Sequence, residues 1–212
     1  MKPQFDLTLY LVTDPKLSGG DLPGKVQAAI QGGVTLVQLR EKTADSRQFL
    51  ETALRVREVT DRYGIPLIIN DRIDIALACN AAGVHLGQQD IPCKIAREIL
   101  EPDKLIGVTA KTVEQAIQAE RDGADYLGCG ALFPSGAKPE AQPMTLSTLS
   151  EILASVHIPV TAIGGINAEN VHLPVEAGAN GVAVVSAILG QPDVSAAARK
   201  LREKIEAANP SG

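Results

Sequence analysis

The chain has 212 residues, of which 45% are hydrophobic, and a formal net charge of −5 at pH 7. That length suits one domain, residues 1–212, with a substantial core. The sequence contains no run of basic residues and no apolar stretch near the roughly 20 residues that span a bilayer, which argues against nucleic-acid and membrane partners. Because the N-terminus MKPQFDLTLYLVTD also lacks a signal-peptide cleavage pattern, we expect a soluble cytoplasmic protein that acts on small molecules. The sequence leaves open whether the protein forms a homo-oligomer.

Eight short runs of aliphatic and β-branched residues recur along the chain, and each is typical of a buried strand. In chain order they are Thr8 to Val12, Thr35 to Leu39, Pro66 to Ile69, Gly83 to Leu86, Leu105 to Val108, Ala124 to Gly128, Pro159 to Ile163 and Gly181 to Val185. The segments between them place apolar residues three and four positions apart and tend to end in glycine, as amphipathic helices do.

Strands separated by single helices indicate a parallel sheet covered by helices. Eight such units favour an α/β fold of the (β/α)₈ TIM-barrel type. A doubly wound open sheet follows the same strand–helix alternation. No Gly-x-Gly-x-x-Gly motif follows the first strand, which disfavours a dinucleotide-binding sheet. Residues 206–212 are expected to form a frayed tail.

The carboxyl ends of barrel strands carry catalytic groups, and here they are rich in polar residues. The second strand runs into Gln38-Leu39-Arg40-Glu41-Lys42. By strand alternation Arg40 and Lys42 face one side, which suits an oligophosphate, although a pair of solvated rim charges is an equal alternative. Gln38 lies on the same face, and its amide could form hydrogen bonds with a heterocyclic ring.

Two carboxylates, Asp71 and Asp90, end neighbouring strands and could hold one Mg²⁺ together with water and substrate phosphate. Each has a structural alternative: Asp71 could pair with Arg72, and Asp90 could start the next helix. Asp74 precedes an apolar helical run and is expected to be a helix N-cap.

The later strand ends suggest a second phosphate site. Gly164-Gly165 follows the seventh strand, and Ser186 follows the eighth before a short helical segment, where barrels commonly bind phosphate. The long polar loop from Phe133 to Pro139 suits a substrate-covering segment, or an ordinary surface excursion. His85, within the fourth strand, is expected to be a satisfied core histidine, and the three cysteines are expected to be buried apolar residues.

Taken in order, these segments resemble thiamine phosphate synthases over nearly the whole chain. The matching motifs are LYLVTD (9–14), VQLREK (37–42), INDRIDIALA (69–78), GVHLGQQD (83–90), GADYLGCGALFP (123–134), PVTAIGGI (159–166) and GVAVVSAI (181–188). The resemblance implies an enzyme that joins a hydroxymethylpyrimidine diphosphate to a thiazole phosphate and releases pyrophosphate.

The resemblance also implies roles for particular residues. The pyrimidine diphosphate would be bound by Gln38, Leu39, Arg40, Glu41, Lys42, Asn70, Thr109 and Lys138. The thiazole phosphate would be bound by Ser135, Gly136, Ala137, Gly165, Val185 and Ser186. One Mg²⁺ would be held by Asp71 and Asp90, and catalysis would rest on Arg40, Lys42, Thr109 and Lys138 without a protein nucleophile.

This chain departs from the family pattern in its sixth loop. The family usually has Thr-x-Thr-Lys where Ser135-Gly136-Ala137-Lys138 stands here, so one hydroxyl is lost at Ala137. Two other functions stay open. A related thiazole tautomerase places its acid–base histidine where this chain has Ala131, and a phosphate-ligand binding protein could keep the barrel without its chemistry.

Overall fold

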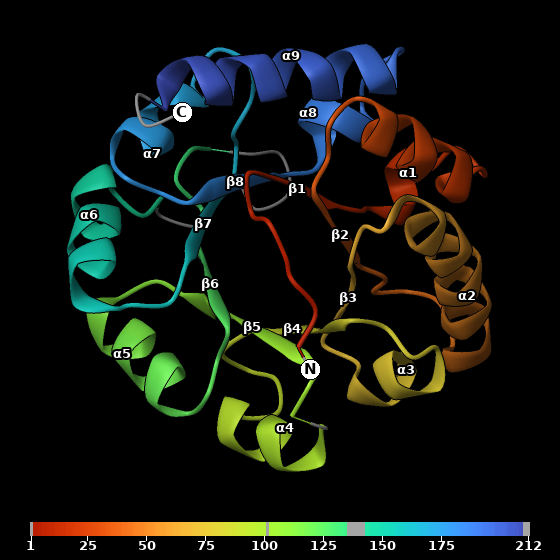
Figure 1. Ribbon diagram of the computed structural model, residues 1–212, viewed down its shortest axis with the longest axis horizontal. Helices are drawn as coiled ribbons and strands as arrows, with labels where there is room; N and C mark the ends of the chain where they lie inside the picture. Colours follow the sequence, from red (N-terminus) through yellow and green to blue (C-terminus); the bar gives the residue numbers. More distant parts are fainter. Residues whose placement is uncertain (1, 101, 135–142, 210–212) are drawn as a thin grey trace.

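The fold is a closed barrel of eight parallel strands, as the sequence predicts (Figure 1). The computed structural model describes residues 2–100, 102–134 and 143–209. Neighbouring strands pair in chain order, and the first pairs with the last. The strands are β1 (Leu9–Val12), β2 (Leu36–Leu39), β3 (Leu67–Asn70), β4 (Gly83–Leu86), β5 (Leu105–Ala110), β6 (Tyr126–Gly130), β7 (Val160–Ile163) and β8 (Gly181–Val184).

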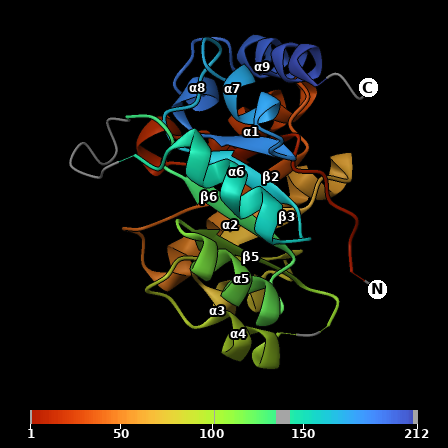
Figure 2. The same ribbon diagram turned by 90° about the vertical axis from the view of Figure 1, so that its left-hand side faces the viewer.

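Helices surround the strand ring and cover its outer face (Figures 1 and 2). Side-chain caps define several of their starts: Asp45, directly before the longest helix, accepts from the backbone N–H of Gln48, and Gly64 ends that helix with φ +66°. The helices are η1 (Pro15–Leu17), α1 (Leu22–Gln31), α2 (Ser46–Tyr63), α3 (Ile73–Ala78), α4 (Cys93–Ile99), α5 (Val113–Arg121), α6 (Leu146–Ser155), α7 (His172–Glu176), α8 (Ser186–Leu189) and α9 (Val194–Ala208).

Two apolar clusters lie on opposite faces of the ring. The larger fills the space between strands and helices, and the smaller lies inside the barrel around Tyr10 and Tyr126. In most strands, successive side chains point alternately to the outer and the inner cluster, as the pleat of a strand requires. Among the described residues, no helix has the length and apolar character needed to cross a bilayer. The three cysteines are free and buried, as expected.

Some boundaries differ from the predicted ones. Strand β5 continues to Ala110, and β6 runs from Tyr126 to Gly130 rather than from Ala124 to Gly128. Helix α9 continues to Ala208, so residues 206–208 are helical rather than frayed. Asp74 is not a helix N-cap: α3 begins at Ile73, and the Asp74 carboxylate accepts two hydrogen bonds from the Arg72 guanidinium.

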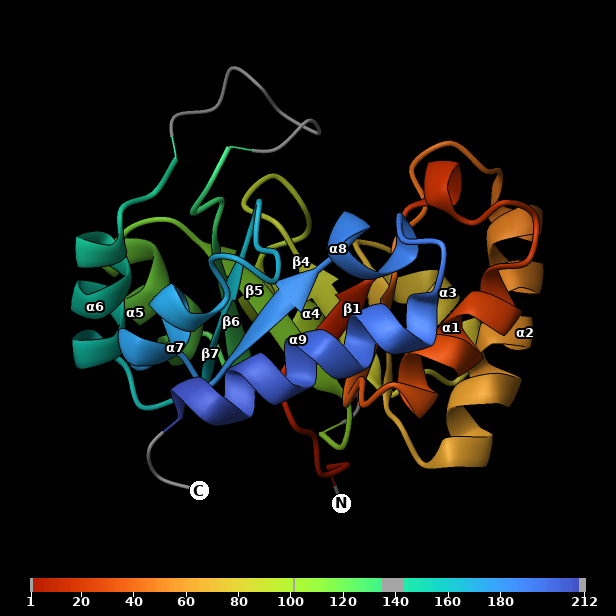
Figure 3. The ribbon, with the colours of Figure 1, turned by 90° about the horizontal axis from the view of Figure 1, so that it is seen from above.

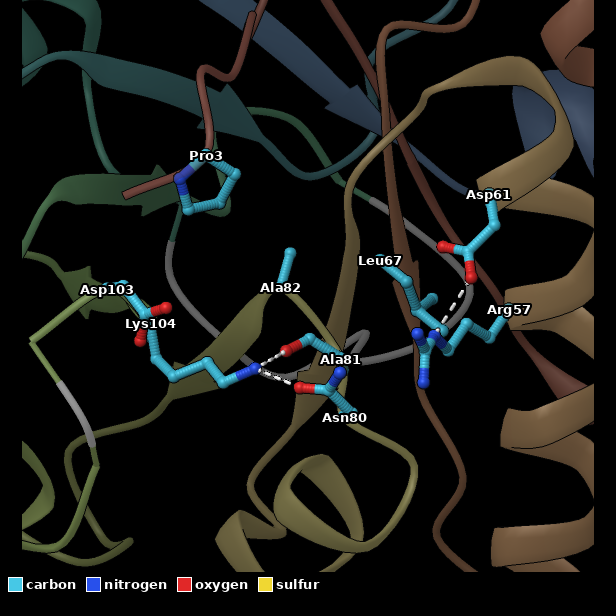
Figure 4. Close-up of a pocket in the computed structure, with 9 residues that line it drawn as sticks. All are labelled: Pro3, Arg57, Asp61, Leu67, Asn80, Ala81, Ala82, Asp103 and Lys104. Carbon is cyan, nitrogen blue, oxygen red and sulfur yellow. Dashed lines mark hydrogen bonds and ion pairs between the residues drawn. The ribbon is translucent and has the colours of Figure 1, made fainter. Parts of the chain in front are cut away.

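The amino-terminal ends of the strands are closed by the first residues of the chain, which lie at the opposite end of the barrel from α8 (Figure 3). Leu7 packs into the inner cluster, and the Lys2 ammonium lies 2.5 Å from the Asp125 carboxylate. A cavity of about 310 Å³ lies beside this end (Figure 4). Its two cations are already engaged: Lys104 donates to Asn80 and Ala81, and Arg57 pairs with Asp61. Because the cavity lies at the amino-terminal ends of the strands, it is at the opposite end of the barrel from the polar strand ends.

Candidate active site

The carboxyl ends of β2, β3 and β4 bring together three of the predicted charged residues. The Lys42 ammonium forms an ion pair with the Asp71 carboxylate, and Asp71 in turn adjoins Asp90, where it helps to raise the pKa of that carboxyl. The structural alternatives for the two carboxylates are wrong: Arg72 pairs with Asp74 instead of Asp71, and α4 begins at Cys93 behind Pro92. Asp90 instead accepts a hydrogen bond of 2.7 Å from the backbone N–H of Gly87.

The backbone at Asp71 has an unusual conformation that places its carboxylate. Its φ is +62°, in the left-handed region, while its N–H still donates to the carbonyl of His85 on the neighbouring strand. Aspartate is among the few residues other than glycine that adopt this region at modest cost. The turn lets β3 stop at Asn70 and directs the next side chain toward Lys42 and Asp90.

The close carboxylates predict a measurable pH effect. Burial, and then the adjoining Asp71, raise the pKa of Asp90, so the folded chain binds this proton more tightly than the unfolded chain. Stability is therefore lost as pH rises through the range above the ordinary pKa of an aspartate. We expect Asp90→Asn to raise the free energy of unfolding at pH 7, by less than about 1 kcal/mol, in metal-free buffer. Urea unfolding at pH 4 and pH 7 checks this, and equal gains at both pH values would contradict it.

Arg40 lies just past the end of β2 and is held through its backbone. Its N–H donates to the Thr13 hydroxyl at 3.0 Å, and that hydroxyl reaches the Arg40 carbonyl at 3.5 Å. Because β2 ends at Leu39, the strand alternation used to place Arg40 and Lys42 on one side does not extend to either residue. Thr13, which directly follows β1, was not predicted to have this role.

Leu39 and Glu41 use their side chains for structure. Leu39 is buried in the cluster outside the ring. The Glu41 carboxylate accepts from the backbone N–H groups of Thr43 and Ala44 and from the Thr43 hydroxyl. Burial by itself would raise the pKa of Glu41, but these hydrogen bonds outweigh it and hold the pKa below its ordinary value. Any ligand contact at these two positions would therefore come from the backbone.

Two predicted binding residues, Gln38 and Asn70, lie inside the barrel and are nearly fully buried. Within the described part of the chain, the Asn70 side-chain nitrogen has no hydrogen-bond partner. A buried amide donor normally has one, since leaving it unpaired costs about 1–3 kcal/mol. Asn70 therefore offers an unused donor directly before Asp71.

A row of buried polar groups crosses the barrel interior beneath this end. It links Gln38 to Thr109 through Tyr10, Tyr126 and His85, all by side-chain hydrogen bonds. His85 is thus a satisfied core histidine, as expected. Burial lowers its pKa to about 4, so its imidazole is neutral at pH 7. The two tyrosines were not singled out from the sequence, because they read as ordinary aliphatic-strand residues.

The ends of β7 and β8 carry the residues predicted to bind the second phosphate. Gly165 has φ +65°, and a Cβ there would lie 2.6 Å from the carbonyl oxygens of Phe133 and Pro134. Val185 precedes the four-residue helix α8, whose first residue is Ser186. The first N–H groups of a helix have no intrahelical acceptor, and barrels often bind phosphate at a short extra helix in this place. The remaining predicted site residues, Ser135, Gly136, Ala137 and Lys138, lie outside the described residues.

Comparison with known proteins assigns the family. A family model described as "Thiamine monophosphate synthase" matches residues 9–188. The chain belongs to this family. Thiamine-phosphate synthase from Clostridium tetani is 53% identical over 198 residues, which cover 93% of this chain and 95% of that protein. The enzyme of the same name from Ruminiclostridium cellulolyticum is also 53% identical, covering 96% and 97% of the two chains.

Solved structures agree with the family assignment. Thiamine phosphate pyrophosphorylase from Pyrococcus furiosus is 40% identical, with a TM-score of 0.88 over 95% of this chain and 96% of that one. The 3-hexulose-6-phosphate synthase from Salmonella typhimurium superposes with a TM-score of 0.71 at 16% identity, over 96% of this chain and 100% of that one. The latter likeness shows the barrel fold alone.

Proposed function

We propose that this member of the thiamine monophosphate synthase family joins a hydroxymethylpyrimidine diphosphate to a thiazole phosphate, giving thiamine phosphate and pyrophosphate. The observation that carries the proposal is the cluster of Lys42, Asp71 and Asp90 at adjacent strand ends. Two adjoining carboxylates beside an ammonium suit a complex of a diphosphate with a cation better than they suit one monophosphate.

The donor set at Asp71 and Asp90 fits magnesium. Hard oxygen ligands from two carboxylates are typical for this ion, which usually keeps waters and substrate phosphate in its remaining positions. Burial, and then the adjoining Asp71, raise the pKa of Asp90 by more than the attraction of Lys42 lowers it. No cluster of three or more metal-binding side chains occurs in the ranges that the structure describes. When bound, Mg²⁺ would neutralise charge on the departing diphosphate.

The protein groups would act mainly by positioning and charge stabilisation. Lys42 and Arg40 would bind the diphosphate, and the sequence adds Lys138 to them. The bond between the pyrimidine methylene carbon and the diphosphate oxygen breaks, and the electron pair leaves with pyrophosphate. The electron-rich ring supports the resulting cation until the thiazole nitrogen donates its lone pair to that carbon. Gln38, Asn70 and Thr109 would hold the ring during this exchange.

The second phosphate would lie against Gly165 and the backbone of Val185 and Ser186. The first N–H groups of α8 provide donors there, and the absence of a side chain at Gly165 leaves room for an anion to approach the backbone. The two phosphate sites would thus lie at different strand ends, with the reacting carbon and nitrogen between them.

Purified protein given both substrates and Mg²⁺ tests the proposal directly. We expect pyrophosphate and thiamine phosphate in equal amounts, measured by a coupled pyrophosphate assay and by chromatography. Binding of both substrates without pyrophosphate release would overturn the proposal in favour of a phosphate-ligand binding protein. Isomerisation of the thiazole without condensation would instead indicate the tautomerase.

A further inference from the structure

Five polar side chains from five different strand regions form one continuous hydrogen-bonded chain inside the barrel. The Gln38 amide nitrogen lies 2.7 Å from the Tyr10 hydroxyl, which lies 2.8 Å from the Tyr126 hydroxyl. That hydroxyl is 3.2 Å from His85 Nδ1, and His85 Nε2 is 3.0 Å from the Thr109 hydroxyl. Both ends of the chain are residues expected to bind the pyrimidine.

The donor and acceptor groups of these five side chains allow the hydrogen bonds to run in only one direction along the row. An amide nitrogen only donates, so the Tyr10 oxygen accepts from Gln38. Tyr10 is 1% exposed, and a buried hydroxyl hydrogen requires an acceptor, which is the Tyr126 oxygen. Tyr126, in turn fully buried, has His85 Nδ1 as its remaining acceptor. His85 then carries its proton on Nε2 and donates it to Thr109.

We propose that Tyr126, with Tyr10 behind it, is a positioning residue: the two buried hydroxyls hold His85 in its Nε2-protonated tautomer and so present the Thr109 hydroxyl as a hydrogen-bond donor. Because Thr109 Oγ1 accepts from His85, its own hydrogen points away from the chain. Gln38 is oriented in the same way, since one of its two N–H groups is fixed by Tyr10.

Two glycines provide the space for this arrangement. A Cβ at Gly107 would lie 2.1 Å from the Tyr126 ring and 2.6 Å from His85 Nδ1, and one at Gly128 would lie 2.9 Å from His85 Cε1. Any larger residue at Gly107 would displace the tyrosine and histidine side chains. The rings also contact each other, with 5.6 Å between the centroids of His85 and Tyr126 and 5.9 Å between those of the two tyrosines.

The consequence for substrate choice rests on the proposed function. A donor hydroxyl at Thr109 matches an unprotonated ring nitrogen. The row of hydrogen bonds does not use the Gln38 amide oxygen, which matches an exocyclic amino group. An aminopyrimidine has both groups. A ring that presents only donors at this position would leave the Thr109 hydrogen unpaired and would bind less well.

Nitrogen-15 NMR of histidine-labelled, ligand-free protein tests the tautomer without any assay of activity. At pH 7 we expect a neutral His85 with Nε2 protonated and Nδ1 accepting a hydrogen bond. We expect Gln38→Glu, once its carboxylate is ionised, to reverse the direction of the hydrogen bonds, because a carboxylate only accepts. The His85 proton would then move to Nδ1. In the double variant Gln38→Glu/Tyr126→Phe the row of hydrogen bonds is interrupted, so the His85 proton should not move to Nδ1. Finding the wild-type proton on Nδ1 would overturn the proposal.

Steady-state kinetics test the functional half of the proposal. We expect Tyr126→Phe to raise the KM for the pyrimidine diphosphate about 10-fold and to leave the KM for the thiazole phosphate unchanged. Tyr63→Phe is the matched control, since it removes an exposed hydroxyl that accepts from Gln31, and it should change neither constant. Equal changes in both KM values for Tyr126→Phe, with a folded protein, would contradict a positioning role.

The two proposals can fail separately. If the wild-type protein releases no pyrophosphate, the proposed function is wrong. The NMR measurement still shows in which direction the side-chain hydrogen bonds run. If pyrophosphate is released but His85 carries its proton on Nδ1, the function stands and the positioning role is wrong.

Discussion

Replacing Gly107 with alanine is expected to lower the free energy of unfolding by about 3 kcal/mol. The added Cβ would lie 2.1 Å from Cζ of Tyr126 and 2.4 Å from its hydroxyl oxygen, far inside van der Waals contact. Both rings around this glycine are buried within the strand ring, so neither can move into solvent. Urea denaturation of the wild type and the variant at pH 7 measures the difference.

A double-mutant cycle shows whether the clash is the cause. In a Tyr126→Ala background the ring is gone, and Gly107→Ala should then cost far less than it does alone. The coupling energy should account for most of the cost of the single substitution, and the rest should come from His85 Nδ1, 2.6 Å from the added Cβ. A loss below about 0.5 kcal/mol for Gly107→Ala alone, the range typical of surface changes, would show that the interior tolerates a Cβ there.

Asp71→Asn is expected to lower kcat on the order of 10³-fold and to weaken the dependence of the rate on Mg²⁺. The substitution removes one of the two carboxylates proposed to hold the ion, and it also removes the partner of Lys42. Asparagine keeps the shape and adopts the left-handed backbone as readily as aspartate, so the fold should persist. Initial rates over a Mg²⁺ titration, beside a thermal unfolding curve, measure both effects.

A nearby carboxylate supplies the matched control. Asp74 lies three residues further along, is exposed, and pairs with Arg72 on the surface. Asp74→Asn should leave kcat and the Mg²⁺ response unchanged. If Asp71→Asn kept the wild-type Mg²⁺ dependence, the ion would have to be held elsewhere, and the assignment of Asp71 and Asp90 would be wrong.

Much of the fold could be predicted because it depends on local patterns. Eight aliphatic runs separated by amphipathic segments leave little choice of architecture, and the closed ring confirms it. The end of β6 was harder to predict, because Gly130, past the predicted end at Gly128, resembles a loop residue in the sequence. Gly130 belongs to the strand because only glycine fits there: a Cβ would lie 1.9 Å from the carbonyl oxygen of Ile163.

The positions of polar residues at single strand ends were predictable from the sequence, and the contacts between them were less so. Position at a strand end was enough to select Asp71 and Asp90, whose contact then follows from the neighbouring positions of β3 and β4. The partner of Lys42 could not be chosen in advance, since it depends on the left-handed turn at Asp71. The Tyr10–Tyr126 bond joins residues 116 positions apart, and only ring closure brings them together.

The pairing of the first strand with the last also governs how the chain can fold. Leu9 pairs with Val182, and α9 packs against α1, so both ends of the sequence are needed to complete the ring. Until β8 has left the ribosome, the nascent sheet has two unpaired edges, which are templates for aggregation. Contacts of such long sequence separation also slow folding. Of the eight strands, β1 is made first and its second partner, β8, is made last, so the barrel cannot close until every strand has been synthesised.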